Sequence, residues 1–547
     1  MPDTPRLRKE QHWDRVVQCY AERPRNLDAM FRATVARSPL AEAVVDGSTR
    51  LTYAQLDTRV DRVCAGLAAR GVKAGDRVAL ILDNRFEAVV ALLAILRLGA
   101  IILPIGTRLR KPELAYILAD AEPVALIHEA SLSGELPEGG FPALNMRFSV
   151  GDEVLAQATT GGTRRPLFVD LANSCASAPP PIEIAEDDLF GILYTSGTTG
   201  RPKGAMLTHF GAVHSCLHWV NVSHLGQDET TVLCIPWTHV SGLCGVLLPF
   251  LHVGGRLVLM AAFDKRKFLE TASAERATHA LLVPAMYGLC LLDPELPSFD
   301  LSSWRLGIFG GAPMPEPTIR RFAQAVPHLV LCNAYGATET TSPATIMPPG
   351  QGMDHSDSIG KVVPCGEIRV MDDAGCELPP GQDGEFWIAG PMVVPGYWRN
   401  DEANRKSFTG GFWKSGDIGS IDTEGFVRIA DRKKDMISRG GFKVYPAEVE
   451  NTLCEMQGVV EAAVVGRHDE IMGEYVVAFL NVRPSGDANA NALPDEAAVR
   501  AFCRERMADY KVPARVLIAS EPLPRNANGK IQKDPLRQRA SQLPPLR

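Results

Sequence analysis

The sequence predicts an α/β fold, with a large N-terminal domain of layered α/β subdomains plus a small β-rich subdomain, followed by a smaller α+β C-terminal domain. Three observations lead to this prediction. The chain has 547 residues, which is more than one hydrophobic core usually supports. Apolar patterns typical of helices and of strands alternate along its first part. The pattern changes after about residue 360 and again after about residue 432.

The alternation of helix and strand patterns is clearest near the start of the chain. The stretch from Leu51 has the apolar spacing of an amphipathic helix, and it stops at Gly71. An apolar helix is expected around residues 87–98. Buried strands are expected at 78–82, 100–104, 124–129, 256–260, 280–285 and 305–311. This alternation predicts a sheet layered with helices.

The later parts of the chain have different patterns. Residues 130–182 are rich in Gly, Pro, Ser and Ala, and we expect much of this stretch to form surface loops. From about residue 360, short strands alternate with turns, which predicts the small β-rich subdomain. After about residue 432, the strings GVVEAAVVG and EYVVAFLNV predict two strands, and a polar loop separates them from a helix at 495–508. The predicted domains are therefore residues 1–431 and 432–547.

Composition and charge narrow the range of functions. The 57 basic and 64 acidic side chains give a net charge of −7, which argues against general nucleic-acid binding. The 12 cysteines are scattered without CxxC spacing, so we expect a reducing, cytoplasmic location rather than a zinc ribbon or disulfide framework. The N-terminus shows no apolar signal core. Arg97 and Pro104 interrupt the most apolar run, residues 89–106, which favours a buried helix and strand over a membrane span.

The string YTSGTTGRPKG, residues 194–204, is the strongest local signal. It combines glycines and hydroxyls with one lysine, Lys203, and offers little apolar surface to bury. Glycines allow backbone N–H groups to approach an anion, hydroxyls donate hydrogen bonds, and the lysine adds a point charge. A strand is expected before the loop and a helix directly after it, which would aim N–H groups at an anion. The composition predicts a phosphate-binding loop, and a mobile surface turn is the alternative.

The complete string is more specific than its composition. YTSGTTGRPKG resembles the signature loop of the adenylate-forming superfamily, which includes acyl-CoA synthetases, firefly luciferase and peptide-synthetase adenylation domains. Further strings resemble motifs of this family in the expected order: YGATET at 335–340, SGD at 415–417, DRKKDMISRGGFKVYPAEVE at 431–450 and PRNANGKIQK at 524–533. The resemblance covers roughly residues 25–535 and is closest in pattern to the acyl-CoA ligases.

The resemblance implies a two-step reaction that uses ATP, Mg²⁺ and CoA. A carboxylate attacks the α-phosphate of ATP, giving acyl-AMP and pyrophosphate, and a thiol, usually of CoA, then displaces AMP. It also implies a mobile C-terminal lid domain that alternates between the two half-reactions. The expected partners are a small-molecule carboxylic acid, ATP and CoA, and we expect a monomer or homodimer.

The resemblance also assigns roles to individual residues. Lys530 is expected to bridge the carboxylate and the α-phosphate, Thr338 to contact phosphate, Glu339 to bind Mg²⁺, and His239 to gate the carboxylate. The phosphate loop comprises Thr195, Ser196, Gly197, Thr198, Thr199, Gly200 and Lys203. The adenine slot comprises Gly311, Ala312, Pro313, Asn333, Ala334, Gly336 and Tyr335, whose ring would stack on the base. Asp417 and Arg432 match the ribose contacts, Lys434 the hinge, and Gly440 and Gly441, with Arg439 and Lys443, the approach to the pantetheine tunnel.

The nature of the acid is inferred from the segment PWTHVSG, residues 236–242, which resembles the border of the acyl pocket. The expected lining is Trp237, Val240, Gly242, Gly310 and Ala337. It has no arginine or lysine to pair with a second carboxylate and no aspartate for an α-amino group, so an apolar monocarboxylic acid, fatty or aryl, is expected. An acyl-CoA ligase is favoured, and a stand-alone acyl-adenylating enzyme that loads a carrier protein is the alternative. His214 and His218 stand four residues apart, but no third ligand is evident and a metal site is not expected there.

Overall fold

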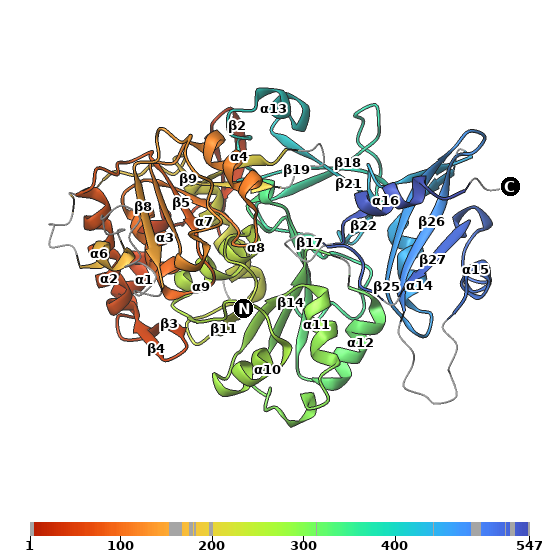
Figure 1. Cartoon of the computed structure of the whole chain (residues 1–547), viewed down its shortest axis with the longest axis horizontal. Coiled ribbons are helices and arrows are strands. Elements are labelled where there is room, and N and C mark those ends of the chain that lie inside the picture. The colour runs from red at the N-terminus through yellow and green to blue at the C-terminus, as the bar shows by residue number, and fades with distance from the viewer. Residues whose placement is uncertain are drawn as a thin grey trace. The chain divides into compact units, whose positions relative to one another are not determined.

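The structure is a computed structural model that divides into two compact units (Figure 1). It describes residues 5–151, 167–173, 179, 182–195, 201–312, 314–440, 442–482, 494–519, 521–525 and 531–544. Unit 1 comprises Met1–Met314, Arg320–Ile368 and Ile388–Lys414, and unit 2 comprises Pro315–Ile319, Arg369–Trp387 and Ser415–Arg547. The domain boundary expected between residues 431 and 432 falls inside unit 2. That residues 432–547 move as one domain stays a prediction.

Two sheets form the framework of unit 1, and the smaller has the strand order β10-β9-β6-β5-β7-β8. All neighbours in it run parallel except β10, which returns antiparallel to β9. Every residue of β6 and β7 is buried, as expected of a parallel sheet covered on both faces. The strands are β5 (Arg77–Ile81), β6 (Ile101–Pro104), β7 (Ala125–Glu129), β8 (Met146–Val150), β9 (Leu189–Thr195) and β10 (Lys203–Thr208).

The larger sheet has nine strands in the order β17-β16-β15-β14-β13-β11-β12-β3-β4. Its six central strands, from β15 to β3, are parallel, and the antiparallel strands β4, β16 and β17 flank them. The strands are β3 (Glu42–Asp46), β4 (Thr49–Thr52), β11 (Thr230–Leu233), β12 (Arg256–Leu259), β13 (His279–Leu282), β14 (Leu306–Gly310), β15 (Val330–Tyr335), β16 (Thr345–Ile346) and β17 (Lys361–Val362). A separate hairpin, β1 (Leu7–His12) and β2 (Arg15–Tyr20), precedes them.

Most of the helices of this part of the chain cover these sheets (Figure 1). They are α1 (Leu27–Arg37), α2 (Tyr53–Ala68), α3 (Phe86–Arg97), α4 (Lys111–Ala121), α6 (Phe168–Ala172), α7 (His209–Ser223), α8 (Val240–Gly242), α9 (Leu248–Val253), α10 (Lys265–Ala274), α11 (Pro284–Leu291), α12 (Glu316–Ala325), which has residues in both units, and α13 (Asp401–Ser407). Short 3₁₀ turns lie at Ala130–Leu132, Leu296–Ser298 and Thr338–Thr340, and a π-helical turn at Leu243–Leu247 joins α8 to α9. A capping box starts α2, because Thr52 and Gln55 bond each other's backbone N–H groups at 3.2 and 2.9 Å.

The most apolar run of the chain is a buried helix followed by a strand, as the sequence predicted. α3 contacts β6 of one sheet and β3 of the other, and it is buried along nearly its whole length. Arg97 lies within it, where its guanidinium pairs with Asp28 at 2.9 Å, Asp57 at 2.7 Å and Asp61 at 2.6 Å. These three carboxylates satisfy a charge that would otherwise be costly to bury.

One buried side chain, Asn84, joins the two sheets of unit 1. It follows β5, and its Nδ2 donates to the carbonyls of Leu233 at 3.0 Å, Ile235 at 2.9 Å and Met260 at 3.0 Å, at the ends of β11 and β12. Its Oδ1 accepts from the backbone N–H of Trp237 at 2.9 Å. Asn84 therefore fixes the start of the segment 236–242 against both sheets.

Asn84→Leu is expected to destabilise unit 1 strongly. Leucine fills the same space but leaves one N–H and up to two carbonyls buried without partners, because the Leu233 carbonyl still accepts from the Met260 N–H at 3.0 Å. The cost is about 3 kcal/mol or more. We expect the midpoint of thermal unfolding to fall by about 3–5 °C in differential scanning calorimetry. The exposed Asn145→Leu, in the same unit, should change it by less than about 2 °C. Equal midpoints for the two variants would contradict the bridging role.

Unit 2 contains parts of two sheets and the helices around them. The first has the order β18-β19-β21, with β22 paired to β21, and the second has the order β24-β23-β26-β25, with β27 parallel to β26. The first sheet is formed by β18 (Glu367–Met371), β19 (Gly384–Ala389) and β21 (Phe412–Ile421), which have residues in both units, by β22 (Val427–Arg432), and by β20 (Phe408–Thr409), which belongs to unit 1 and pairs with the start of β21. The remaining elements of unit 2 are β23 (Ile437–Arg439), β24 (Phe442–Val444), α14 (Pro446–Cys454), β25 (Val459–Asp469), β26 (Gly473–Val482), α15 (Glu496–Arg504), a 3₁₀ turn at Asp509–Lys511, β27 (Arg515–Ala519) and α16 (Lys533–Ser541).

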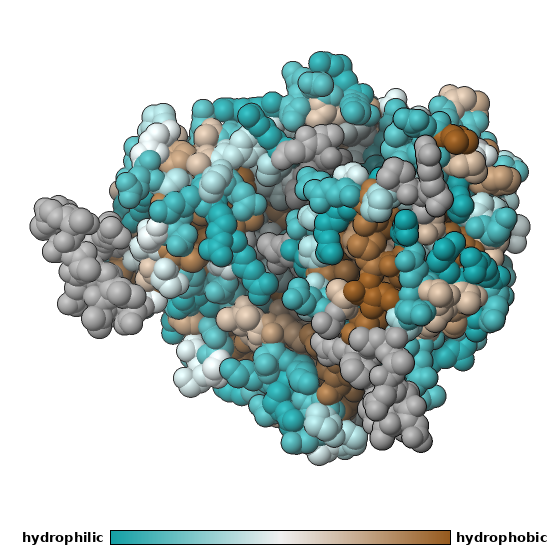
Figure 2. All heavy atoms as spheres, turned by 45° about the vertical axis from the view of Figure 1, so that its right-hand side comes forward, coloured by the Kyte–Doolittle hydropathy of each residue, from teal (hydrophilic) through white to brown (hydrophobic). Residues whose placement is uncertain are grey.

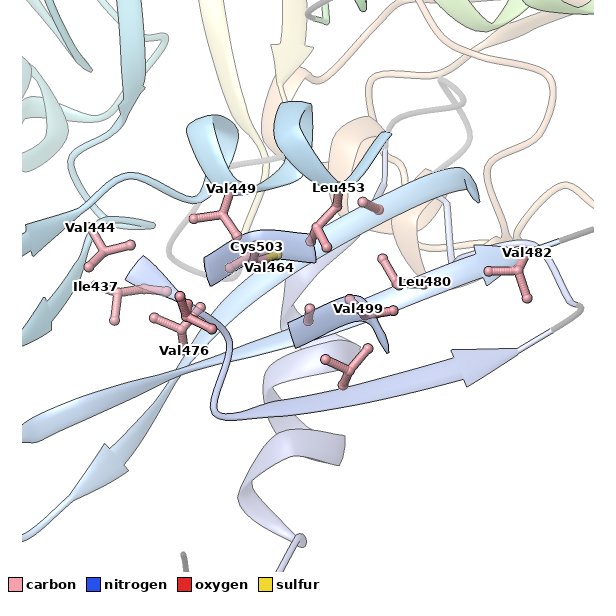
Figure 3. Packing of buried hydrophobic residues seen from close by; sticks show 14 residues of the cluster. Ile437, Val444, Val449, Leu453, Val464, Val476, Leu480, Val482, Val499 and Cys503 are labelled. Carbon is pink, nitrogen blue, oxygen red and sulfur yellow. The ribbon is translucent and has the colours of Figure 1, made fainter. Parts of the chain in front are cut away.

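The core of unit 2 lies on both faces of β25 and β26. Figure 3 shows one face, where Val464 and Val476 meet Val449 of α14 and Val499 of α15. The alternate residues of both strands pack on the other face with Leu536 of α16. Successive side chains of a strand point to opposite faces. Because both faces of these two strands are buried, their sequences are continuous apolar runs.

One face of the molecule can be described by the hydropathy of its residues. Figure 2 shows one face, on which hydrophilic residues predominate and apolar residues gather in limited patches. Among the residues that the structure describes, no helix is both long enough and apolar enough to cross a membrane. The cysteines within the described ranges are all free thiols, and most of them are buried.

Candidate active site

The predicted phosphate loop joins two antiparallel strands. Thr195 ends β9 and pairs in register with Lys203, which begins β10. The helix predicted after the loop, from about Met206, is present as α7, but it does not follow the loop directly, because residues 203–208 pair with β9 as a strand. α7 begins only at His209, where Thr208 caps it by accepting from the N–H of Gly211 at 3.0 Å. Five loop residues lie outside the described residues: Ser196, Gly197, Thr198, Thr199 and Gly200.

Neighbouring segments tie down both ends of this loop. On β9, the Tyr194 hydroxyl donates to the carboxylate of Asp120 in α4. On β10, the Gly204 carbonyl accepts from the N–H of Trp398 at 2.7 Å. An antiparallel bridge joins Ala205 to Tyr397. The loop stem is thus held between α4 and the segment 396–398.

The residues expected around adenine leave two adjacent parallel strands at the same edge of the larger sheet. Gly310, the last residue of β14, is the register partner of Ala334 in β15, so the residues after each strand emerge side by side. The exposed Gly311 and Ala312 follow β14, and Tyr335 ends β15 half-buried. This arrangement brings the two predicted walls of the slot together. Pro313 lies outside the described residues.

Small residues at these positions have a structural cause. A Cβ on Gly310 would lie 2.3 Å from the Ala334 carbonyl oxygen, so only glycine fits between the strands. Gly336 is similarly confined, because a Cβ there would lie 3.2 Å from the Cα of Pro343. Asn333 donates from Nδ2 to the Ser358 carbonyl at 3.2 Å, which holds its side chain toward the neighbouring loop.

Glu339 lies in the 3₁₀ turn that follows β15 and is 9% exposed. Its backbone carbonyl accepts from the Val394 N–H at 2.9 Å, and its Oε1 accepts from the Tyr397 hydroxyl at 2.8 Å. The Nζ of Lys203 lies 4.9 Å from the centroid of the same tyrosine ring. Burial and the adjacent Glu339 carboxylate raise the pKa of Tyr397, so its hydroxyl stays protonated and donates. Tyr397 was not among the residues expected from the sequence, because it lies in no periodic pattern.

The chain reverses sharply just after Glu339. Thr341 and Ser342 both have positive φ, 47° and 39°, a left-handed conformation that costs energy in residues with a side chain. Two contacts hold this turn: the Thr341 hydroxyl donates to the Met392 carbonyl at 2.7 Å, and the Ser215 hydroxyl donates to the Ser342 carbonyl. Strain held in place beside a candidate site residue is typical of functional loops.

The carboxylate of Glu339 and the hydroxyl of Thr338 next to it are hard oxygen donors, which Mg²⁺ prefers. The carboxylate is buried, and the hydrogen bond that Tyr397 donates comes from a neutral group, which leaves the carboxylate its charge. The chemistry of this donor set therefore fits a magnesium ion. A bound Mg²⁺ would neutralise phosphate charge and polarise the phosphoryl group.

In unit 2, the two residues expected to bind ribose lie opposite each other. Asp417 of β21 is the cross-strand partner of Arg432 of β22, and Arg432 Nε lies 3.2 Å from Asp417 Oδ1. The Ser415 hydroxyl accepts from the Asp417 N–H at 3.0 Å and so fixes the local backbone. Asp417 is 5% exposed, whereas the Arg432 side chain is 52% exposed. The structure thus brings together a buried carboxylate and a solvent-accessible guanidinium.

The expected hinge and tunnel residues also belong to unit 2. Lys434 is exposed in the turn after β22, within the stretch where the N–H groups of Asp435 and Met436 bond the Arg432 carbonyl. Gly440 begins the tight turn between β23 and β24 with φ +58°, which explains the glycine. Lys443 is exposed in β24, and Arg439 donates to the Tyr510 carbonyl at 2.8 Å. Gly441 and Lys530 lie outside the described residues.

The segment expected to border the acyl pocket is anchored by backbone and core contacts. Trp237 is 1% exposed, and its indole N–H donates to the Leu82 carbonyl at 2.8 Å. A Cβ on Gly242 would lie 2.3 Å from the Pro236 carbonyl oxygen, so this glycine is required by the turn. His239 and Val240 are half-buried at the start of α8. Ala337, also half-buried, precedes the turn that carries Glu339.

His214 and His218 are core residues of α7. Nδ1 of His214 donates to the Phe210 carbonyl at 2.9 Å, and Nε2 accepts from the Tyr20 N–H at 3.3 Å, which describes a neutral ring with both nitrogens used. Burial lowers the pKa of His214 to about 3 and also lowers that of His218. The nitrogens of His214 are therefore already engaged within the core.

Glu10, His12 and Glu186 place their donor atoms within 4.8 Å of one another, which suggests a second possible metal site. Arg23 instead pairs with both carboxylates, at 2.7 Å from Glu10 and 2.8 Å from Glu186. The guanidinium therefore supplies the positive charge that the acids require. This ion-pair network attaches the N-terminal hairpin to the rest of unit 1.

The buried histidines predict an acid-sensitive fold. His214 titrates near pH 6.5 when unfolded and near 3 when folded, so protons bind the unfolded state preferentially between these values. Its contribution to stability is complete above pH 6.5 and falls by about 1.4 kcal/mol per pH unit as the pH drops toward 3. Thermal unfolding should show a lower midpoint at pH 5.5 than at pH 7.5, and His218→Leu should lessen this difference. If His218→Leu shows the same difference between the midpoints at pH 5.5 and pH 7.5 as the unaltered chain, the buried His218 does not contribute to the acid sensitivity.

Comparison with known proteins gives consistent matches along the chain. Residues 31–398 match the model of the AMP-binding enzyme family, and residues 448–530 match that of the AMP-binding enzyme C-terminal domain. The chain is 36% identical over 502 residues to a feruloyl-CoA synthase of Amycolatopsis sp, covering 92% of this chain and 96% of that protein. It is 34% identical over 524 residues to a long-chain-fatty-acid–CoA ligase of Mycobacterium tuberculosis, covering 94% and 99%. The structure of ATP-bound MatB from Rhodopseudomonas palustris superposes with a TM-score of 0.83 at 32% identity, covering 94% and 99%.

Proposed function

The chain belongs to the AMP-binding enzyme family, and we propose that it is an ATP-dependent, AMP-forming acyl-CoA ligase for an apolar monocarboxylic acid. The acid is activated as an acyl-adenylate, with release of pyrophosphate, and CoA then takes the acyl group with release of AMP. The observation that carries the proposal is the grouping of Lys203 and Glu339 around the ring of Tyr397. A cation beside a metal-binding carboxylate suits a site that receives a polyphosphate.

The roles of the other residues follow from this grouping. Lys203 donates to phosphate oxygens and offsets their charge as the acid approaches. The slot after β14 and β15 receives adenine, with Tyr335 stacking on the base. Asp417 accepts hydrogen bonds from both ribose hydroxyls, and Arg432 orients that carboxylate through their 3.2 Å contact. Lys530 contacts the α-phosphate and the carboxylate during adenylation, and movement about Lys434 exchanges it for the segment 439–443 in the second step.

An apolar acid is supported by the character of the segment 236–242. Trp237, Val240 and Gly242 bring no charge to it, so a second carboxylate or an α-amino group would lack a partner there. The relatives activate both kinds of apolar acid, since one acts on ferulate and another on long-chain fatty acids. The small residues at Gly242 and Gly310 reflect close backbone packing, so the choice between fatty and aryl acids rests on His239, Val240 and Ala337.

The first test is to incubate the purified chain with ATP, Mg²⁺ and a panel of acids, with and without CoA. The panel contains ferulic acid, a medium-chain and a long-chain fatty acid, succinic acid and phenylalanine, and the products are identified by mass spectrometry. We expect acyl-CoA, AMP and pyrophosphate with one of the apolar monocarboxylic acids. Turnover of succinic acid alone would overturn the substrate class. Acyl-AMP that accumulates despite CoA would favour the carrier-protein loader.

A further inference from the structure

The backbone of Tyr397 is held from two sides. On one side it forms the bridge to Ala205 in β10, next to the hydrogen bond from Trp398 to the Gly204 carbonyl. On the other side, Oδ1 of Asn404 in α13 accepts from the Tyr397 N–H at 2.6 Å, and Nδ2 donates to the Tyr397 carbonyl at 3.2 Å. The position of this residue is therefore fixed before any ligand binds.

The side chain of Tyr397 contacts both charged groups of the candidate site. The residue is 4% exposed, and Phe408 packs against its ring edge-on, with centroids 5.6 Å apart. Its hydroxyl donates to Oε1 of Glu339 at 2.8 Å, and Nζ of Lys203 lies 4.9 Å from its ring centroid. A single rigid phenol thus joins a cation from the smaller sheet to an anion that follows the larger sheet.

Each contact restricts a group that would otherwise rotate. A hydrogen bond at Oε1 limits rotation of the carboxylate and so sets the direction in which Oε2 can point. A cation–π contact limits the motion of the long lysine side chain. Both contacts come from a neutral group, so Lys203 and Glu339 retain the charges that they present to a ligand. Pre-organised charges lose less entropy when a ligand binds.

We propose that Tyr397 is a positioning residue that fixes the metal-binding carboxylate of Glu339 and the phosphate-binding ammonium of Lys203 in one geometry. The inference rests on the proposed function, because it takes Glu339 and Lys203 as groups that bind Mg²⁺ and ATP. The hydroxyl positions Glu339, the group that binds the metal, and the ring positions Lys203, the group that binds phosphate. The hydroxyl can be removed alone, and then the hydroxyl and the ring together.

The test compares Tyr397→Phe, which removes only the hydroxyl, with Tyr397→Leu, which removes the hydroxyl and the ring. Mn²⁺ replaces Mg²⁺ as the probe, and its binding in the presence of ATP is measured by electron paramagnetic resonance. ATP binding in excess EDTA is measured by equilibrium dialysis. For Tyr397→Phe we expect Mn²⁺ affinity to fall about ten- to a hundredfold, the loss of one hydrogen bond to a charged group. ATP affinity without metal should change less than about threefold.

For Tyr397→Leu, both affinities should fall, because Lys203 also loses its partner. Loss of packing is controlled with Phe408→Leu, which removes the ring that packs against Tyr397 and keeps Lys203, Glu339 and Tyr397 itself. That variant should lower the unfolding midpoint as Tyr397→Leu does, while retaining Mn²⁺ and ATP affinities. A Tyr397→Phe variant with unaltered Mn²⁺ affinity would overturn the inference, as would an unaltered chain that binds no Mn²⁺ with ATP.

The two proposals fail in different ways. The binding measurements use only ATP and Mn²⁺, so they decide the role of Tyr397 whether or not acyl-CoA is formed. Failure of the acid panel with intact Mn²⁺ and ATP binding would reject the proposed substrate class while the role of Tyr397 stands. Intact acyl-CoA synthesis with wild-type Mn²⁺ affinity in Tyr397→Phe would reject the positioning role alone.

Discussion

Replacing Glu339 by glutamine is expected to slow acyl-AMP formation about 10²- to 10³-fold, measured as kcat/KM for ATP. The amide keeps the size of the side chain, and its oxygen can still accept from the Tyr397 hydroxyl. The substitution therefore removes the negative charge and little else. A neutral oxygen is a much poorer ligand for Mg²⁺, and the phosphate charge would then be offset less completely as the acid attacks.

The measurement for this variant is pyrophosphate release at increasing Mg²⁺ concentration. Glu339→Gln should require a higher Mg²⁺ concentration for half-maximal rate, and its unfolding midpoint should be close to that of the unaltered chain. The exposed Glu138→Gln, in the same unit, controls for the loss of one negative charge and should behave as the unaltered chain does. A large loss of rate with an unchanged Mg²⁺ requirement would assign Glu339 a role other than metal binding.

The core strands and the long helices could be predicted because their residues are buried continuously. The strand expected at 124–129 is β7 at Ala125–Glu129, and the helix expected around 87–98 is α3 at Phe86–Arg97. The two strands of unit 2 were also predicted in place, as β25 and β26. In each case both faces of the element are covered, so the apolar run and the element have nearly the same limits.

Elements at sheet edges were harder to predict. The last part of β10, residues 206–208, was expected to be helical, because these residues continue without a break into the apolar pattern of α7. Pairing with β9 decides its conformation, and such pairing is a long-range contact that leaves no mark on the local sequence. The hairpin of β1 and β2 was missed for a related reason. Its residues are largely polar, and ion pairs such as Arg23 with Glu10 and Glu186 attach it to unit 1.

The site could be predicted where it coincides with contiguous strings, and the remainder depends on tertiary contacts. The pairing of Asp417 with Arg432 across β21 and β22 joins two motifs that the sequence presents separately. Tyr397 carries no signal in the sequence, because its role depends on lying between Lys203 and Glu339, residues 194 and 58 positions away. From the sequence alone, a glycine at position 310 is compatible both with space for the acyl group and with close packing of two strands. The 2.3 Å that would separate a Cβ at this position from the neighbouring carbonyl oxygen identifies the packing.

Lys530→Ala is expected to reduce acyl-AMP formation about 10³-fold or more while largely sparing thioester formation from supplied acyl-AMP. In the first step a carboxylate must approach a negatively charged phosphate, and one ammonium that contacts both groups offsets their repulsion in the transition state. In the second step the phosphate leaves as AMP, and the proposed domain movement has withdrawn this lysine from the site. A residue used in one half-reaction should affect only that half-reaction.

The nearby Lys533 provides the matched comparison, because it belongs to the same motif but has a structural role. Its Nζ lies 2.8 Å from Oε1 of Glu450, at the start of α16. Glu450 also accepts from the backbone N–H of Val464 at 2.7 Å, so this ion pair links α16 to α14 and β25. Lys533→Ala should therefore lower the unfolding midpoint and, where activity is lost, affect both half-reactions in proportion.

The two half-reactions are measured separately for both lysine variants. Adenylation is followed by pyrophosphate release without CoA, and thioesterification by acyl-CoA formation from synthetic acyl-AMP without ATP. A ratio of the two rates that falls about 10³-fold in Lys530→Ala and stays constant in Lys533→Ala would assign the first step to Lys530. A constant ratio in both variants would instead mean that residue 530 acts on the stability or movement of unit 2. The same ratio measured for Glu339→Gln should fall with that of Lys530→Ala, because both side chains act on the phosphates of ATP before AMP becomes a leaving group.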